Sequence, residues 1–193
     1  MENKLQAKDL INVGIFTALY FVIFFATGML GYIPILMLLI PFLCPLVAGI
    51  PFMLFMTRVN KFGMVTIMGT ILGLLMLLTG HPWTIVPFAM IVAFLGDLVL
   101  KSGDYSNWSR IKLGYVVFSQ WLMGLLIPIF FMRDSYFQTI RAGYGDAYTD
   151  ALLKVTPPWV FWAMIVLAAL GAFTGATIGR AALKKHFQRA GIA

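Results

Sequence analysis

Residues 10–30 read LINVGIFTALYFVIFFATGML, a run without a single charged side chain that follows the polar opening MENKLQAKD. A helix needs roughly 20 mostly apolar residues to cross about 30 Å of hydrocarbon, so this run predicts a membrane-spanning helix. The run is too long for the apolar core of a secretory signal, and no small-residue cleavage site precedes the next polar sequence. We therefore expect it to remain in the bilayer as the first span.

The composition of the whole chain supports the same environment. Hydrophobic residues make up 61% of the 193 residues and charged residues only 11%, whereas soluble domains are nearer half apolar and a quarter charged. The net charge is +7, but no basic face alternates with exposed aromatic residues, so we expect no nucleic-acid binding. Cys44 is the only cysteine, which excludes a disulfide framework and a cysteine metal cluster.

Five further apolar stretches follow the first, and together they predict an all-α integral membrane protein with six transmembrane helices in one domain, 1–193. The expected spans are residues 10–30, 34–57, 62–78, 83–100, 111–132 and 158–183. Pro41, Pro45 and Pro51 interrupt the second span, and each removes one helix hydrogen bond. We expect this span to be kinked or divided into two short helices, either as a packed kink or with freed carbonyls that contact a ligand.

The basic residues predict how the spans are oriented. Eleven of the fourteen Lys and Arg residues lie near the chain ends or in the connections after the second and fourth spans: Lys4, Lys8, Arg58, Lys61, Lys101, Arg110, Lys112, Arg180, Lys184, Lys185 and Arg189. The other three, Arg133, Arg141 and Lys154, lie between the fifth and sixth spans. Because Lys and Arg are retained on the cytoplasmic side, both termini are expected inside.

Residues 133–157 are then a long extracellular loop between the fifth and sixth helices. Within this loop, YFQTIRAG (136–143) and GDAYTDALLKV (145–155) can each form a short amphipathic surface helix. Asp146 or Thr149 can cap the second of them. A connection of this length is usually functional or disordered.

The residues that carry chemistry in membrane enzymes and ion pumps are nearly absent. Asp97 is the only acid inside an expected span, and Lys101 lies on the same helix face four residues later. We expect these two to form an interfacial ion pair, or to contact a partner on the cytoplasmic side, rather than a proton relay. His81 and His186 lie outside the spans, and no phosphate-binding glycine loop is present. We therefore expect no enzyme activity, catalytic residue, metal site or cofactor.

The outer ends of the helices hold the candidate substrate-binding residues. Aromatic residues at this depth form either an interfacial belt or the walls of a pocket closed by the long outer loop. Arg133 can hold a carboxylate or phosphate, pair with Asp134, or contact a lipid headgroup. We expect Gln120 and Ser119 to hydrogen-bond to another helix, although Gln120 can instead face a ligand. The candidates are Tyr32, His81, Trp83, Gln120, Arg133, Tyr136, Trp159 and Trp162.

The first helix carries a patch of small residues. Gly14 and Ala18 are four residues apart, and Asn12 lies beside them. Such a patch lets another helix approach closely, either within the bundle or from a partner protein.

Four stretches give the chain a family resemblance: KDLINVGIFTALYFVIFF (8–25), VNKFGMVTIMGTILGL (59–74), GDLVLKSGDYSNW (96–108) and YVVFSQWLMGLLIP (115–128). With them, the chain resembles the substrate-binding S components of energy-coupling-factor (ECF) transporters over nearly its whole length. It is similar in particular to the S-component family named after treponemes and streptococci.

The resemblance implies a function. An S component is a compact six-helix subunit in a bacterial cell membrane that binds a vitamin or related metabolite in its outer half. Its partners are a membrane-embedded T component and two cytoplasmic ATPases. In related S components an AxxxA motif on the first helix docks against the T component, and Gly14 and Ala18 occupy the matching positions. A stand-alone secondary transporter or facilitator, and a membrane scaffold without transport, remain the alternatives.

Overall fold

The computed structural model describes residues 4–59 and 61–187, and every regular element in these ranges is helical. The elements in chain order are α1 (Ala7–Gly28), η1 (Met29–Tyr32), α2 (Pro34–Met37), α3 (Ile40–Met56), α4 (Met64–Leu78), α5 (Ile85–Lys101), α6 (Trp108–Ser119), η2 (Gln120–Leu122), α7 (Met123–Phe131), α8 (Arg133–Val155), α9 (Val160–Ala182) and η3 (Leu183–Phe187).

Three helical stretches are long and apolar enough to cross a membrane: Ala7–Tyr32, Trp108–Phe131 and Val160–Lys185. They correspond to the first, fifth and sixth expected spans. Helices α3 and α4 are apolar but shorter, with 17 and 15 residues, and α5 has 17 residues. The prediction of an all-helical membrane protein is confirmed, whereas the number of crossings stays a prediction.

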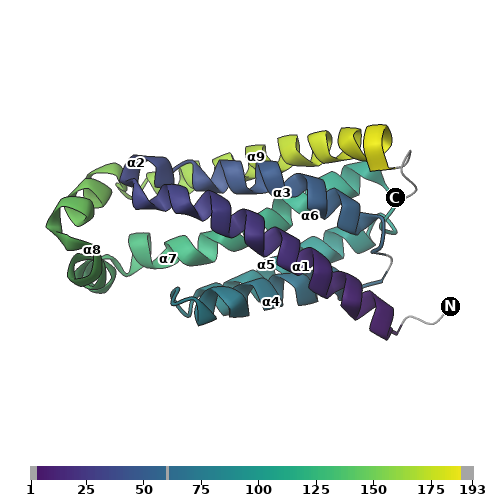
Figure 1. Ribbon diagram of the computed structural model, residues 1–193, viewed down its shortest axis with the longest axis horizontal. Coiled ribbons are helices and arrows are strands. Elements are labelled where there is room, and N and C mark those ends of the chain that lie inside the picture. The colour runs from purple at the N-terminus through teal and green to yellow at the C-terminus, as the bar shows by residue number, and fades with distance from the viewer. Residues whose placement is uncertain (1–3, 60, 188–193) are drawn as a thin grey trace.

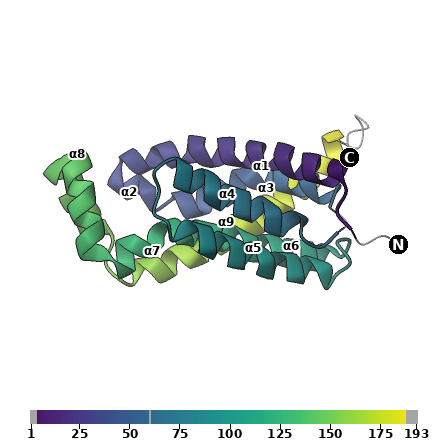
Figure 2. The ribbon, with the colours of Figure 1, turned by 90° about the horizontal axis from the view of Figure 1, so that it is seen from below.

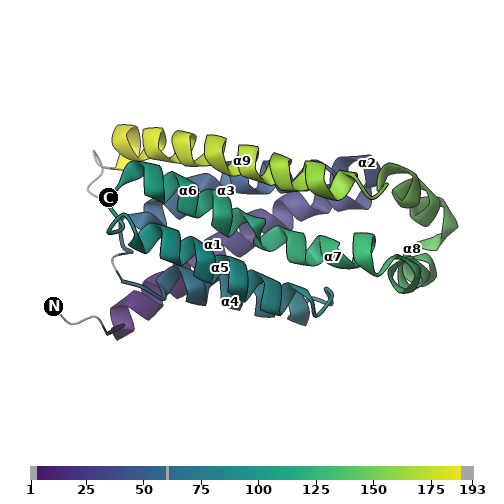
Figure 3. The same cartoon turned by 180° about the vertical axis from the view of Figure 1, so that it is seen from behind.

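The helices form an elongated bundle with different features at its two ends (Figures 1 and 2). Helix α8 lies across one end, and the start of α1 and the end of α9 lie at the other. Arg58 and Lys61 lie in the α3–α4 connection, and Lys101 and Arg110 lie in the helix ends beside the α5–α6 connection. Both connections are at this second end, as the view from behind also shows (Figure 3). Arg189, counted with the same group above, lies outside the described residues.

Glycines allow the closest helix contact in the bundle, between α3 and α9. A Cβ atom on Gly49 would lie 2.3 Å from the carbonyl carbon of Gly175, and one on Gly171 would lie 2.2 Å from the carbonyl oxygen of Phe42. The two backbones therefore touch, as small residues permit in membrane helices. Gly69 and Gly73 of α4 lie against the Cβ atoms of Ala93 and Ala89 of α5.

The proline-rich second span is divided as expected. Helix α2 ends at Met37, and α3 begins at Ile40. Pro45 and Pro51 lie inside α3 and are packed against neighbouring helices, and the Tyr115 hydroxyl donates a 2.7 Å hydrogen bond to the Pro45 carbonyl oxygen.

The predicted ion pair between Asp97 and Lys101 is wrong. Asp97 is fully buried and accepts hydrogen bonds from the backbone of Gly63 and from both the amide and the hydroxyl of Thr66. It also accepts one from the Tyr105 hydroxyl. These bonds satisfy free backbone amides at the start of α4. A negative charge at the N-terminal end of a helix is also stabilised by the helix dipole. Asp97 thus joins α5 to α4.

Residues 133–155 agree with the two short surface helices expected over residues 136–143 and 145–155. They are helical, with one break at Gly145, whose φ of 80° and ψ of 175° only glycine adopts readily. The guanidinium of Arg141 pairs with Asp146 and Asp150 on the far side of the break. The ion pairs across the break join residues five and nine positions apart, so no helix spacing in the sequence indicated them.

Candidate functional site

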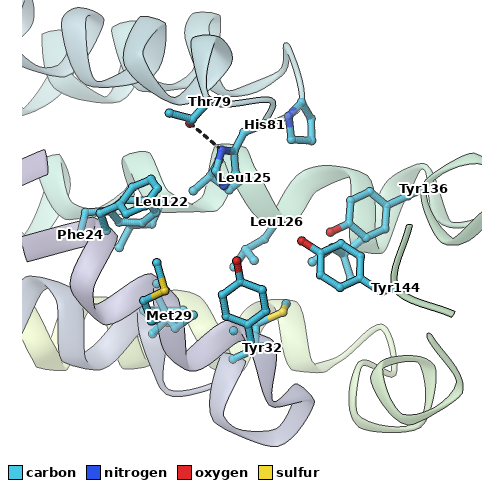
Figure 4. A pocket seen from close by; sticks show the side chains of 18 of the residues that line it. Phe24, Met29, Tyr32, Thr79, His81, Leu122, Leu125, Leu126, Tyr136 and Tyr144 are labelled. Carbon is cyan, nitrogen blue, oxygen red and sulfur yellow. Dashed lines mark hydrogen bonds between the residues drawn. The ribbon is translucent and has the colours of Figure 1, made fainter. Parts of the chain in front are cut away.

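A cavity of about 330 Å³ lies at the α8 end of the bundle (Figure 4). This volume is at the lower end of the range for small-molecule sites, about 300–1,000 Å³. Its lining comes from α1, η1, α2, α3, the α4–α5 turn, η2, α7 and α8, and consists of Phe24, Phe25, Gly28, Met29, Gly31, Tyr32, Met37, Ile40, Pro41, Thr79, His81, Pro82, Leu122, Leu125, Leu126, Ile129, Tyr136, Tyr144 and Tyr148.

One apolar wall comes from η2 and α7. Leu122, Leu125, Leu126 and Ile129 have the spacing i, i+3, i+4, i+7, which places all four side chains on the same face of a helix. The sequence contained this pattern, but it could not be distinguished from ordinary helix packing without knowing what faces it. In the structure, that face borders the cavity.

The opposite wall begins where α1 ends. The chain turns through η1 and enters α2 at Pro34, a residue favoured in the first turn of a helix. This turn brings Met29, Gly31 and Tyr32 to the cavity. Pro41 also lines it, so one of the three prolines of the second span borders the site.

Three tyrosines of α8 close the end of the cavity. The rings of Tyr144 and Tyr148 stack with centroids 5.0 Å apart, and Tyr32 of η1 lies 6.4 Å from Tyr144. Burial raises the pKa of Tyr136 to about 12, so its hydroxyl stays protonated at neutral pH. Figure 4 shows the hydroxyls of Tyr32, Tyr136 and Tyr144 directed toward the middle of the cavity.

Among the lining residues given above, one is a histidine, His81, and none is Asp, Glu, Lys or Arg. Its Nδ1 lies 3.0 Å from the Thr79 hydroxyl oxygen and 3.2 Å from the Met76 carbonyl oxygen. The Thr79 hydroxyl itself donates to the Met76 carbonyl. Desolvation lowers the pKa of His81 below its usual 6.5, so the ring is neutral at pH 7.

Three of the eight candidate substrate residues line the cavity: Tyr32, His81 and Tyr136. Trp83, Trp159 and Trp162 are about two-thirds exposed, which fits the alternative of an interfacial belt. Whether any of the eight binds substrate stays a prediction.

Gln120 and Arg133 are committed to other contacts. Gln120 Nε2 donates to the Ile165 carbonyl of α9, so the expected bond between helices is present. Ser119, expected to bond in the same way, donates to Val116 of its own helix. Arg133 donates to the carbonyls of Thr156 and Ile129, and its guanidinium lies 5.1 Å from the Phe137 ring.

The candidates did not include most of the residues that form the cavity. Phe24, Met29, Leu126 and Tyr144 line it, although each also fits an ordinary apolar helix or outer loop in the sequence. The repeated tyrosines of residues 136–148 were the one available signal.

The predicted docking residues lie on the exposed face of α1. Gly14 and Ala18 are exposed, and Asn12 is half-buried. A Cβ atom on Gly14 would meet nothing within 4 Å. The patch is therefore not used for packing within the described part of the bundle.

The described residues contain no cluster of three or more His, Cys, Asp or Glu side chains that could hold a metal ion. Neither a curated protein nor a solved structure matches the chain. The family model described as hypothetical bacterial integral membrane protein (Trep_Strep) matches residues 7–189, and the chain belongs to this family of integral membrane proteins.

Proposed function

We propose that this chain is the substrate-capture subunit, the S component, of an ATP-driven ECF importer for a vitamin or related small metabolite. The observation that carries the proposal is the 330 Å³ cavity at the α8 end, with apolar and aromatic walls and a small number of polar groups. This combination is typical of small-molecule sites. Three of the lining residues belong to α8, and α8 lies at the end of the bundle opposite the start of α1 and the end of α9 (Figure 1).

The proposal includes an orientation in the bacterial cell membrane. The end opposite α8 holds the α3–α4 connection with Arg58 and Lys61, and the α5–α6 connection with Lys101 and Arg110 in the helix ends beside it. Such basic residues are retained in the cytoplasm. Six crossings with both termini inside then place the cavity toward the exterior. Labelling of single cysteines at Lys101 and at Asp150 with an impermeant reagent tests this orientation, because only the second should react from outside.

The proposal also includes partners. The subunit has no predicted site for ATP hydrolysis, so energy comes from two cytoplasmic ATPases through a membrane-embedded T component. Its docking surface is the exposed face of α1 around Asn12, Gly14 and Ala18, which is flanked by the exposed apolar residues Ile11 and Ile15. Substrate captured outside is released inside when the subunit tilts in the membrane.

Ligand screening of the purified chain against vitamins and their precursors tests the proposal directly. A true ligand raises the melting temperature as its concentration exceeds Kd. Leu126→Trp and Met29→Trp narrow the cavity from different walls and should weaken binding of that ligand at least tenfold. Leu78→Ala, at an exposed site outside the cavity, should not. A ligand unaffected by both tryptophan variants would refute the cavity as the capture site.

Reconstitution separates the alternatives. Uptake that requires the T component, the ATPases and ATP supports an S component. Uptake by liposomes that contain this chain alone indicates a facilitator or secondary transporter. If the chain neither binds ligand nor supports uptake, a membrane scaffold is the better description.

A further inference from the structure

The cavity offers no charged side chain to a ligand. None of its 19 lining residues is Asp, Glu, Lys or Arg. Arg133 is held by two backbone carbonyls and by the Phe137 ring. Arg141 is paired with Asp146 and Asp150. Tyr32 and Tyr144 of the lining are more than half exposed, so a charged ligand would lose only part of its water. It would gain no counter-ion in return, which is unfavourable.

The hydrogen-bond pattern around His81 fixes which ring nitrogen carries the proton. Thr79 uses its single hydroxyl proton on the Met76 carbonyl, so its oxygen acts as an acceptor toward His81. Nδ1 of His81 faces this oxygen and the Met76 carbonyl, which are both acceptors. Nδ1 must then be the protonated nitrogen, and in a neutral ring Nε2 carries a lone pair.

Nε2 has no hydrogen bond to another residue in the described part of the chain. His81 lines the cavity, and its Nδ1 edge faces the α4–α5 turn, as the dashed line to Thr79 in Figure 4 indicates. The acceptor nitrogen is therefore the group that this residue can offer to a ligand.

The remaining walls favour a ring. Tyr32, Tyr136 and Tyr144 direct their hydroxyls into the space (Figure 4), while Phe24 and Phe25 lie on the α1 side. Flat aromatic surfaces pack well against a flat ligand, and aromatic pairs gain about 0.5–1.5 kcal/mol beyond their buried area.

From these contacts we infer that the cavity binds an uncharged, ring-containing molecule whose N–H or O–H group donates a hydrogen bond to Nε2 of His81. This inference rests on the proposed capture function and names the chemical class of its substrate. It replaces the anionic ligand that Arg133 allowed from sequence alone.

Four small probes test the inference by equilibrium dialysis with the purified full chain in detergent. Indole is neutral and has an N–H donor, and benzofuran has the same shape without the donor. Indole-3-carboxylate adds a negative charge, and tryptamine adds a positive charge. Some of each probe dissolves in the detergent micelles. This background is corrected by subtracting the amount of probe retained by the Leu126→Trp variant, whose cavity is blocked. Met29→Trp is the second blocked variant if the first does not fold.

The expected order is indole, then benzofuran, then the two charged probes. One net hydrogen bond corresponds to a preference for indole over benzofuran of about three- to tenfold. Each charged probe should bind at least about tenfold more weakly than indole. His81→Phe keeps a ring but removes Nε2, so the preference for indole should fall to about one. Leu78→Ala, an exposed site at the end of α4 that does not line the cavity, should leave the preference unchanged.

The outcomes separate this inference from the proposed function. Tighter binding of a charged probe that both blocked variants abolish would leave the capture site standing and overturn the substrate class. Equal binding of indole and benzofuran, or a preference that survives His81→Phe, would overturn the role of Nε2. If no probe distinguishes the native chain from the blocked variants, the capture site fails as well.

Discussion

The hydroxyl of Tyr148 donates a 2.7 Å hydrogen bond to the carbonyl oxygen of Gly31, which lies 117 residues earlier in the chain. This bond joins α8 to the turn that follows α1, and both residues line the cavity. Helix α8 is therefore attached to the cavity wall on the opposite side rather than only to its neighbours in sequence.

Removing this bond should loosen the end of the cavity. Tyr148→Phe should lower stability by about 1 kcal/mol, the usual net value of one hydrogen bond. For a chain of this size, that corresponds to a melting temperature lower by about 2–4 °C. Hydrogen exchange of residues 29–32 should become faster. Tyr32→Phe is the control, since its hydroxyl bonds to no other described residue, and an equal effect of both variants would contradict the role of the bond.

Asp97→Asn should be far more destabilising than its small change in size implies. The carboxylate accepts four hydrogen bonds from Gly63, Thr66 and Tyr105, and the amide replaces one acceptor oxygen with a donor. Bonds to a charged group contribute about 1.5–3 kcal/mol each, so we expect a loss of at least about 2 kcal/mol. Thermal unfolding checks this, with the exposed Asp104→Asn as matched control. Equal melting temperatures would refute the role of Asp97.

The glycine contact between α3 and α9 predicts opposite effects for two Gly→Ala changes. In Gly175→Ala the new Cβ would lie 2.4 Å from the Pro45 carbonyl oxygen, so the helices must separate. Such overpacking costs about 1–3 kcal/mol. In Gly14→Ala the new atom meets nothing within 4 Å, and Ala is favoured over Gly in a helix by about 0.5–1 kcal/mol. Thermal unfolding should therefore show a lower melting temperature for the first variant only.

The α1 docking surface can be tested without affecting the cavity. Gly14→Leu and Ala18→Leu should each prevent co-purification with the T component and ATPases, because the larger side chain blocks close helix approach. Melting temperature should not fall, and ligand affinity should stay unchanged. Val166→Leu, an equally exposed site on α9, is the control for added bulk. Normal complex formation by both α1 variants would exclude this surface.

Stability should depend on pH through His81. Its pKa is lowered in the folded protein by desolvation, so the unfolded chain binds a proton first as pH falls below about 6.5. Folding stability is thus fully present above that pH and is lost between it and the folded-state pKa. Melting temperatures at pH 7.5 and 5.5 should differ more for the native chain than for His81→Gln. An equal difference in both would contradict this contribution.

Much of the fold could be predicted from local patterns. Apolar length identified the positions of the helices, and the prolines after Ile40 indicated a divided second span. The partner of Asp97 could not be predicted, because Thr66 and Tyr105 come from other elements and no periodic pattern connects them. Local spacing instead favoured Lys101.

The candidate site was predicted less completely for a related physical reason. Position near the membrane surface made both Trp159 and Tyr136 candidates. In the structure Trp159 is exposed, whereas Tyr136 lines the cavity. Which of them faces inward depends on helix rotation and on the bend at Gly145. These are set by tertiary contacts, including the ion pairs of Arg141.

The concentration of basic residues at one end also limits how the protein can move. In the proposed orientation these cations lie on the negative side of the cell's resting potential, and carrying one elementary charge through that field costs about 2.3 kcal/mol per 100 mV. The membrane potential therefore opposes movement of these cations away from the cytosolic side. In the proposed transport cycle, tipping would then pivot about that end and carry the uncharged cavity inward.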